Sequence, residues 1–178
     1  MNRVLIVVDM QNDFAHKNGA LTTPEAQKCV PAVCALIDEF RKNNEMIYFT
    51  QDTHFEDYRS TQEGLKLPID HCRYGSWGWR IIDECDIKED APQAKVKHLS
   101  KTTFGYEDWF IEHLEKYDEI WLCGLVSSIC VVSNALIIKQ LCPETPIKFV
   151  AYASAGLNPA NHKAAIEVMR SCQIEIVE

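Results

Sequence analysis

The chain of 178 residues is 47% hydrophobic and 25% charged, and it carries a formal net charge of −8. This length and composition predict one globular domain over residues 1–178 with a full hydrophobic core, and they exclude a largely disordered chain. The acidic charge and the lack of a basic cluster disfavour nucleic acid and anionic membrane surfaces as partners.

Apolar runs alternate with segments of helical periodicity along nearly the whole chain. Such alternation predicts an α/β protein with a central, mostly parallel sheet between two helical layers, a three-layer α/β/α Rossmann-like fold. The irregular region from Asp52 to about Gly78 is long enough to suggest a functional segment. In chain order the patterns predict a strand over Arg3–Asp9, a helix over Pro24–Asn43, strands over Glu45–Gln51 and Gln93–Leu99, a helix over Glu107–Lys116, a strand over Glu119–Cys123, a helix over Ser128–Leu141, a strand over Ile147–Tyr152, a helix over Pro159–Ser171 and a strand over Gln173–Val177.

Neither an export signal nor a membrane span is expected. The apolar run Val4–Val8 is too short for the core of a signal peptide, and no stretch approaches about 20 apolar residues. Eight cysteines without an export signal predict reduced thiols and a cytoplasmic location.

The stretch Gly124–Val132 places a cysteine where a nucleophile is expected. The apolar strand Glu119–Cys123 precedes it, and apolar residues at helical spacing follow it. Ser127 or Ser128 is expected to cap the helix through its hydroxyl. Cys130 then lies in the first helical turn, where unpaired N–H groups and the macrodipole favour a thiolate. The pattern indicates a cysteine hydrolase.

Charged residues also follow the other predicted strands, at the edge where parallel sheets gather ligands. Asp9 either caps the turn after the first strand or faces Cys130 as a general base. Lys101, after the third strand, is an ordinary surface charge unless it reaches Asp9 and Cys130. There it would stabilise both the thiolate and the carboxylate.

Asp52 and His54 have the spacing of two ligands of one cation, because side chains two apart in an extended segment point the same way. Together with His71, they form a set that suits Zn²⁺, Fe²⁺ or Mn²⁺ with positions left open. Glu63 is a candidate fourth ligand. The alternative is that the histidines are solvated surface groups. The local competitors as ligands are Asp57, Asp70 and His98.

These motifs, in this order, resemble those of the isochorismatase-like cysteine hydrolases, and within them the nicotinamidase branch. The resemblance covers nearly all of the chain. It rests on the D-x-Q-x-D-F pattern at Asp9–Phe14, Asp52-Thr-His54, Leu67-Pro68, His71–Gly78, Lys101, and Gly124–Cys130.

The resemblance implies an Asp9–Lys101–Cys130 catalytic triad and a cis peptide bond before Val126. The backbone N–H groups of Val126 and Cys130 would form the oxyanion hole. The branch deamidates nicotinamide to nicotinate and ammonia. The implied cofactor is a divalent metal, with Zn²⁺ favoured over Fe²⁺ or Mn²⁺, and the implied assembly is a homo-oligomer, a dimer or a tetramer. The residues implied as metal ligands are Asp52, His54 and His71, with Glu63 less secure; those implied at the substrate pocket are Phe14 and Leu67.

Two positions depart from the pattern of many nicotinamidases and put the substrate in question. Ser128 stands where an aspartate is common, and Leu67 stands where a tryptophan is common. One alternative is therefore a related cysteine hydrolase that acts on another small amide. A second is a member that binds a ligand without catalysis.

Overall fold

The computed structural model describes residues 1–88 and 95–178. Its strands form one six-stranded sheet in the order β3-β2-β1-β4-β5-β6, and every neighbouring pair is parallel. The strands are β1 (Arg3–Val8), β2 (Met46–Asp52), β3 (Val96–Lys101), β4 (Glu119–Leu125), β5 (Ile147–Ala155) and β6 (Glu175–Val177). The α-helices are α1 (Asn12–Ala15), α2 (Pro24–Lys42), α3 (Gln62–Lys66), α4 (Val132–Leu141) and α5 (Pro159–Ser171).

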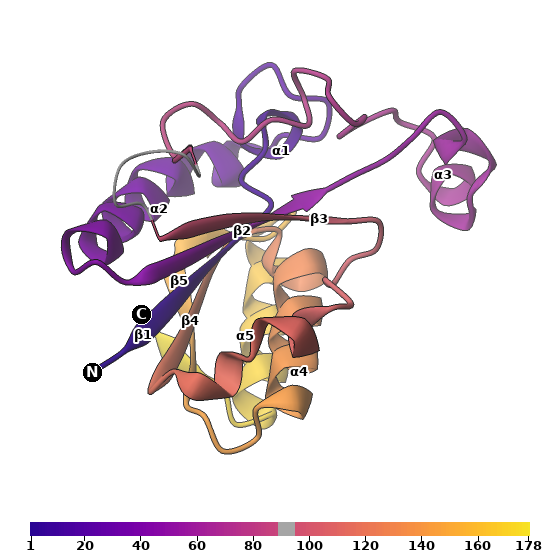
Figure 1. The fold of residues 1–178 in the computed structure, drawn as a ribbon. Coiled ribbons are helices and arrows are strands. Elements are labelled where there is room, and N and C mark those ends of the chain that lie inside the picture. The colour runs from indigo at the N-terminus through magenta and orange to yellow at the C-terminus, as the bar shows by residue number, and fades with distance from the viewer. Residues whose placement is uncertain (89–94) are drawn as a thin grey trace.

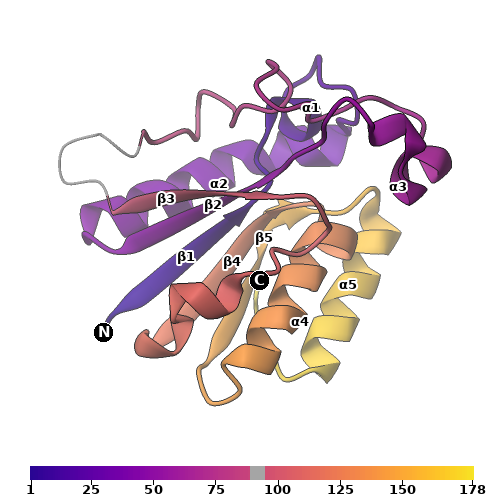
Figure 2. The same cartoon turned by 45° about the vertical axis from the view of Figure 1, so that its right-hand side comes forward.

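Helices cover both faces of this sheet, so the predicted three-layer architecture is confirmed. Figure 1 shows α2 on one side and α4 and α5 on the other, and the turned view in Figure 2 agrees. Alternate residues of β1 separate the two cores, because successive side chains in a strand point to opposite faces. Leu5 and Val7 pack in the core with α2, whereas Ile6 and Val8 pack in the core with α4 and α5.

Local sequence explains the long helix α2. Pro24 occupies its first turn, and the Thr23 hydroxyl accepts the N–H of Ala26 at 3.1 Å. Its buried face includes Leu36 and Phe40. None of the described helices has the length and apolar character that a membrane span requires.

Several predicted elements differ from those observed. The predicted helix over Glu107–Lys116 is wrong: two short 3-10 turns, Trp109–Glu112 and Leu114–Lys116, lie there instead. His113 between them has φ 50°, a left-handed conformation that an α-helix does not admit. The third strand is predicted over Gln93–Leu99, and Gln93 lies outside the described residues. The observed strand β3 starts at Val96 and ends at Lys101, two residues later than predicted.

The predicted helix over Ser128–Leu141 begins differently from the expectation. Ser127–Val131 is a π-helical turn, and regular α-helix starts only at Val132. No serine hydroxyl caps either element, so the capping prediction is wrong. Ser127 is instead hydrogen-bonded to Nδ1 of His162 at 2.9 Å. The chain therefore enters this helix through a widened turn that carries Cys130.

Candidate functional site

The sheet brings Asp9, Lys101 and Cys130 together at the carboxyl ends of its strands. Lys101 Nζ lies 2.8 Å from Asp9 Oδ2 and 3.7 Å from Cys130 Sγ. The strand register explains this meeting. Val8 pairs with Thr50 on one side and with Gly124 on the other, so the residues that follow these strands share one edge.

A glycine at position 124 is needed for this close approach. Gly124 has φ 112°, and a Cβ there would collide with the backbone of Val8. Strands β1 and β4 can therefore end close together, and the segments that carry Asp9 and Cys130 leave the sheet side by side.

Burial dominates the electrostatics of this cluster. Asp9, Lys101 and Cys130 are 0%, 4% and 7% exposed. Burial raises the pKa of the Asp9 carboxyl, although the Lys101 ammonium and the Thr50 hydroxyl oppose this effect. Burial disfavours the Lys101 ammonium, but the nearby carboxylates of Asp9 and Asp52 outweigh this effect and hold the pKa of Lys101 above its usual value.

The same reasoning corrects the expectation of a resting thiolate. Burial raises the pKa of the Cys130 thiol well above its usual value, against the attraction of Lys101. The resting group is a thiol, which needs a base to become a nucleophile. The neighbouring carboxylate, Asp9, is placed to be that base.

A second cluster lies beside the first. Among the described residues, Asp52, His54 and His71 form the one group whose ligand atoms all lie within 4.8 Å of one another. Asp52 Oδ2 is 3.0 Å from His54 Nε2 and 3.5 Å from His71 Nε2. Glu63 Oε1 is 3.8 Å from His54 Nε2 and 4.0 Å from His71 Nε2, at the edge of the group.

These residues fit a divalent cation. His71 Nδ1 lies 2.8 Å from the carbonyl oxygen of Ile69, a contact that makes Nδ1 the protonated nitrogen and leaves Nε2 free to bind a metal. His54 Nε2 is buried and makes no hydrogen bond, although Asp52 Oδ2 lies 3.0 Å away, so this nitrogen fits the role of a metal ligand. Two imidazoles and a carboxylate form a ligand set typical of Zn²⁺, Fe²⁺ and Mn²⁺.

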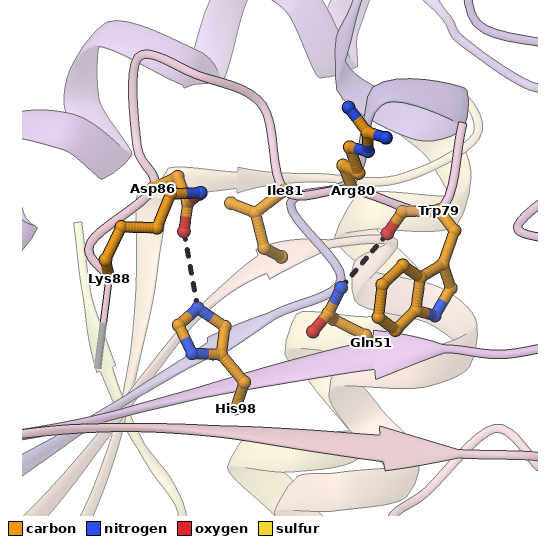
Figure 3. A pocket seen from close by; sticks show the side chains of 7 residues that line it. All are labelled: Gln51, Trp79, Arg80, Ile81, Asp86, Lys88 and His98. Carbon is orange, nitrogen blue, oxygen red and sulfur yellow. Dashed lines mark hydrogen bonds and ion pairs between the residues drawn. The ribbon is translucent and has the colours of Figure 1, made fainter. Parts of the chain in front are cut away.

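Two of the three competing residues, Asp70 and His98, have other contacts. Asp70 forms an ion pair with Arg59 at 2.7 Å. His98 lies 3.3 Å from Asp86 in a separate pocket of about 420 Å³, lined also by Gln51 and Trp79 (Figure 3).

Asp52 connects the two clusters through its two oxygens. Oδ2 faces the histidines, while Oδ1 lies 3.4 Å from Lys101 Nζ. The charge of Lys101 keeps the pKa of Asp52 below its usual value despite burial, so this carboxylate is ionised at neutral pH.

The peptide bond between Leu125 and Val126 is cis, as the resemblance implied. Val126 and Cys130 lie in the same π-helical turn, which the N–H of Val131 closes by donating to the carbonyl of Val126 at 3.2 Å. Ser128, between them, has a buried hydroxyl oxygen without a hydrogen-bond partner.

A cavity of about 790 Å³ opens beside both clusters. Its walls include His54 and Glu63 from the candidate metal group, together with Ile129, which precedes Cys130. Leu67 lines it as well. Phe14 is not among the residues that line this cavity, but its ring lies edge-on to His71 of the candidate metal group at a centroid distance of 5.8 Å. The aromatic side chains on the cavity wall are Phe55, Tyr58 and Phe104.

Two residues at the site were not singled out from the sequence. The Thr50 hydroxyl donates to Asp9 Oδ1 at 2.6 Å. The Gln11 side chain pairs with the backbone of Asp52 in both directions, accepting its N–H and donating to its carbonyl, each at 2.8 Å. Gln11 belongs to the D-x-Q-x-D-F pattern, which was a signal for it. Thr50 lies within an apolar strand and had none.

Known proteins resemble this chain along its whole length. The isochorismatase domain family matches residues 3–178. A nicotinamidase from Saccharomyces cerevisiae is 25% identical over 186 aligned residues, which cover 82% of this chain and 85% of the relative.

Solved structures show the same fold. A nicotinamidase/pyrazinamidase from Bacillus subtilis superposes with a TM-score of 0.87 at 26% identity, covering 100% of both chains. A pyrazinamidase from Pyrococcus horikoshii in complex with zinc gives a TM-score of 0.82 at 27% identity, covering 100% of this chain and 99% of the other.

Proposed function

The chain belongs to the isochorismatase family and is a hydrolase of an amide C–N bond, and from this premise we propose that it deamidates nicotinamide to nicotinate and ammonia. The observation that carries the proposal is the position of Lys101, 2.8 Å from Asp9 and 3.7 Å from Cys130, beside the Asp52–His54–His71 group. The names of the relatives above support this substrate. The alternative of another small amide is kept because Leu67 and Ser128 depart from the common nicotinamidase pattern.

In the proposed reaction, Asp9 takes the proton of the Cys130 thiol, and the sulfur attacks the amide carbonyl carbon. The negative charge that develops on the carbonyl oxygen is stabilised by the N–H groups of Val126 and Cys130. Donors of this kind contribute about 3–4 kcal/mol each. Asp9 then returns the proton to the departing nitrogen, and ammonia leaves behind a thioester on Cys130.

Hydrolysis of the thioester completes the cycle. Asp9 takes a proton from water, the resulting hydroxide attacks the thioester carbonyl, and the proton passes to the departing sulfur. Lys101 keeps its charge throughout and stabilises Asp9 as a carboxylate and Cys130 as a thiolate in turn.

Asp52, His54 and His71 would hold the metal, with Glu63, at the edge of the group, as the candidate fourth ligand. A divalent ion held there would orient the substrate by binding its ring nitrogen or a water next to it. Zn²⁺ is the first candidate, and Fe²⁺ and Mn²⁺ are the alternatives. Tyr58, Phe104 and Leu67 would contact the substrate ring from the cavity wall.

Two further proposals concern the setting of the enzyme. A cytoplasmic location is supported by the cysteines, all eight of which are free thiols. A homo-oligomer, either a dimer or a tetramer, stays a prediction that light scattering on the purified protein would check.

The direct test of the proposed function is ammonia release from nicotinamide by the purified protein, with metal content measured in the same preparation. Turnover that is lost on alkylation of Cys130 supports the proposal. A folded, metal-loaded protein that releases no ammonia from nicotinamide but does so from another small amide would replace the substrate and retain the chemistry.

His54→Ala is expected to lower the metal content of the purified protein by more than half and to raise KM more than it lowers kcat. One of two buried imidazole ligands is lost, and the role proposed for the metal is orientation. Metal analysis by mass spectrometry is the measurement, and His113→Ala, on an exposed histidine, is the control. Unchanged metal content in His54→Ala would contradict the proposed site.

Thr50→Val is expected to shift the acidic limb of the kcat/KM profile upward by about one pH unit. The Thr50 hydrogen bond stabilises the Asp9 carboxylate and so lowers its pKa, and a hydrogen bond to a charged group is worth about 1.5 kcal/mol. Asp9 must be ionised to act as a base. Without the Thr50 hydroxyl its pKa is higher, so activity appears only at higher pH. A pH profile with an unshifted acidic limb would show that Asp9 is not the titrating base.

A further inference from the structure

Asp13 is a carboxylate, 9% exposed, that the proposed reaction does not use. It lies in α1, and both of its oxygens accept backbone N–H groups. Oδ1 accepts from Ala20 at 3.1 Å, and Oδ2 accepts from Cys72 at 2.7 Å. A charge-assisted bond to a buried backbone amide is among the stronger hydrogen bonds in a protein. Asp13 therefore connects α1 to the nearby Ala20 and to Cys72, which lies 59 residues away along the chain.

The bond to Cys72 reaches both histidines of the candidate metal group. Cys72 follows His71 directly, and its own carbonyl accepts the N–H of His54 at 3.0 Å. Its backbone has φ 45°, in the left-handed region that residues other than glycine rarely adopt. One residue thus joins Asp13 to His54 and His71, in a backbone conformation that needs support from its surroundings.

Other hydrogen bonds from side chains hold the backbone near Asp52 and Trp79. The Gln11 side chain brackets the backbone of Asp52 and also donates to the carbonyl of Trp79 at 2.8 Å. Figure 3 shows the Trp79 carbonyl receiving a further bond, from Gln51 at 3.1 Å. The N–H of Asp13 donates to the carbonyl of Gly78 at 3.0 Å.

Gly78 is also packed against the Asp13 side chain. A Cβ at position 78 would collide with the Asp13 carboxylate. A methyl group there would displace the carboxylate without removing it, which provides a perturbation independent of any change to Asp13 itself.

We propose that Asp13 is a positioning residue for the metal site: its carboxylate holds the Cys72 backbone and thereby sets the relative positions of His54 and His71. The inference rests on the proposed function, which places a metal at these histidines. Residues that orient metal ligands through hydrogen bonds, without binding the metal themselves, typically contribute about 10–100-fold to metal affinity. Asp13 acts here through the backbone that connects the ligands, and it does not touch the metal or the substrate.

The test is the dissociation constant for Zn²⁺, measured by equilibrating the metal-loaded protein with a chromophoric chelator. Asp13→Ala is expected to weaken binding about 10–100-fold. Gly78→Ala is expected to weaken it in the same direction with the carboxylate still present. Asp13→Asn, which retains one acceptor oxygen, is expected to lie between Asp13→Ala and the wild type.

A matched control separates positioning from general loss of stability. Asn158 caps α5: its side-chain oxygen accepts the N–H of Asn161 at 2.9 Å. Asn158→Ala removes this cap and leaves the hydrogen bonds of Asp13, Cys72 and Gly78 unchanged. It is expected to lower the unfolding temperature and leave the zinc affinity unchanged. An equal loss of affinity in Asn158→Ala would overturn the inference, as would unchanged affinity in a folded Asp13→Ala or Gly78→Ala protein.

Failure of the metal site itself has a different signature. If the wild type binds zinc, His54→Ala does not and Asp13→Ala binds as tightly as the wild type, the site is correct and only the role of Asp13 is wrong. A wild-type protein that binds no divalent metal overturns both.

Discussion

Cys130→Ala is expected to abolish amide hydrolysis, with a loss of at least about 10⁴-fold in kcat. The proposed thioester forms on Cys130 Sγ, which lies 3.7 Å from Lys101 Nζ, and no other sulfur is proposed to attack the substrate. The measurement is ammonia release under saturating substrate. Mass spectrometry of the wild type, quenched during turnover, is expected to show an acyl group on the peptide that contains Cys130.

The variant is expected to bind as much metal as the wild type, since Cys130 is not part of the Asp52–His54–His71 group. Cys172→Ser is the matched control: its thiol is half-buried at the end of α5, outside the site, and activity is expected to be unchanged. Residual turnover above about 1% in Cys130→Ala, free of wild-type contamination, would remove Cys130 from the role of nucleophile.

Lys101→Met is expected to reduce both stability and activity. It leaves the buried carboxylates of Asp9 and Asp52 without the ammonium that lies 2.8 and 3.4 Å away. Removal of one partner of a buried ion pair costs about 3–5 kcal/mol. The pKa of Asp9 would rise further, because the ammonium that opposes the effect of burial is gone, and the carboxyl would be less available as a base. Denaturant unfolding and kcat/KM at neutral pH are the two measurements.

A second substitution separates the two effects. Asp9→Asn in the Lys101→Met background removes one uncompensated carboxylate, so stability is expected to recover in part while activity stays lost. Full stability in the single variant Lys101→Met would contradict the view that Lys101 compensates these charges. Full activity would contradict its part in the triad.

The raised pKa of Cys130 gives Asp9 a necessary part in the proposed reaction. A thiol buried in this way does not ionise by itself at neutral pH, in spite of Lys101. Lys101 is a cation that lies near the carboxylates of Asp9 and Asp52 and the sulfur of Cys130. When a proton moves from Cys130 to Asp9, the net charge around Lys101 stays constant, so Lys101 stabilises the cluster before and after the transfer. Burial therefore contributes to the mechanism as well as to the packing.

Much of the architecture was predictable because its signals are local. The apolar runs of β1, β2 and β4 and the helical periods of α2 and α5 lie in contiguous segments, and their alternation predicts a parallel sheet between helices. The same rule predicts that residues following the strands meet at one edge. For that reason Asp9, Asp52, His54, Lys101 and Cys130 could be proposed as neighbours from the sequence. Their grouping into a triad and a metal site with His71, which follows no strand, rested on the resemblance to the isochorismatase-like hydrolases.

What only the tertiary structure decided depends on contacts between distant residues. Thr50 bonds to Asp9 across 41 residues, and Asp13 bonds to Cys72 across 59. His113 interrupts a predicted helix by adopting a left-handed conformation, and Cys130 lies in a π-helical turn where a regular helix was expected. The state of the Cys130 thiol likewise follows from burial by the assembled core, which outweighs the effect expected from its local position. Local patterns determined which residues reach the edge of the sheet, and the packing of the whole chain decided their hydrogen bonds and charges.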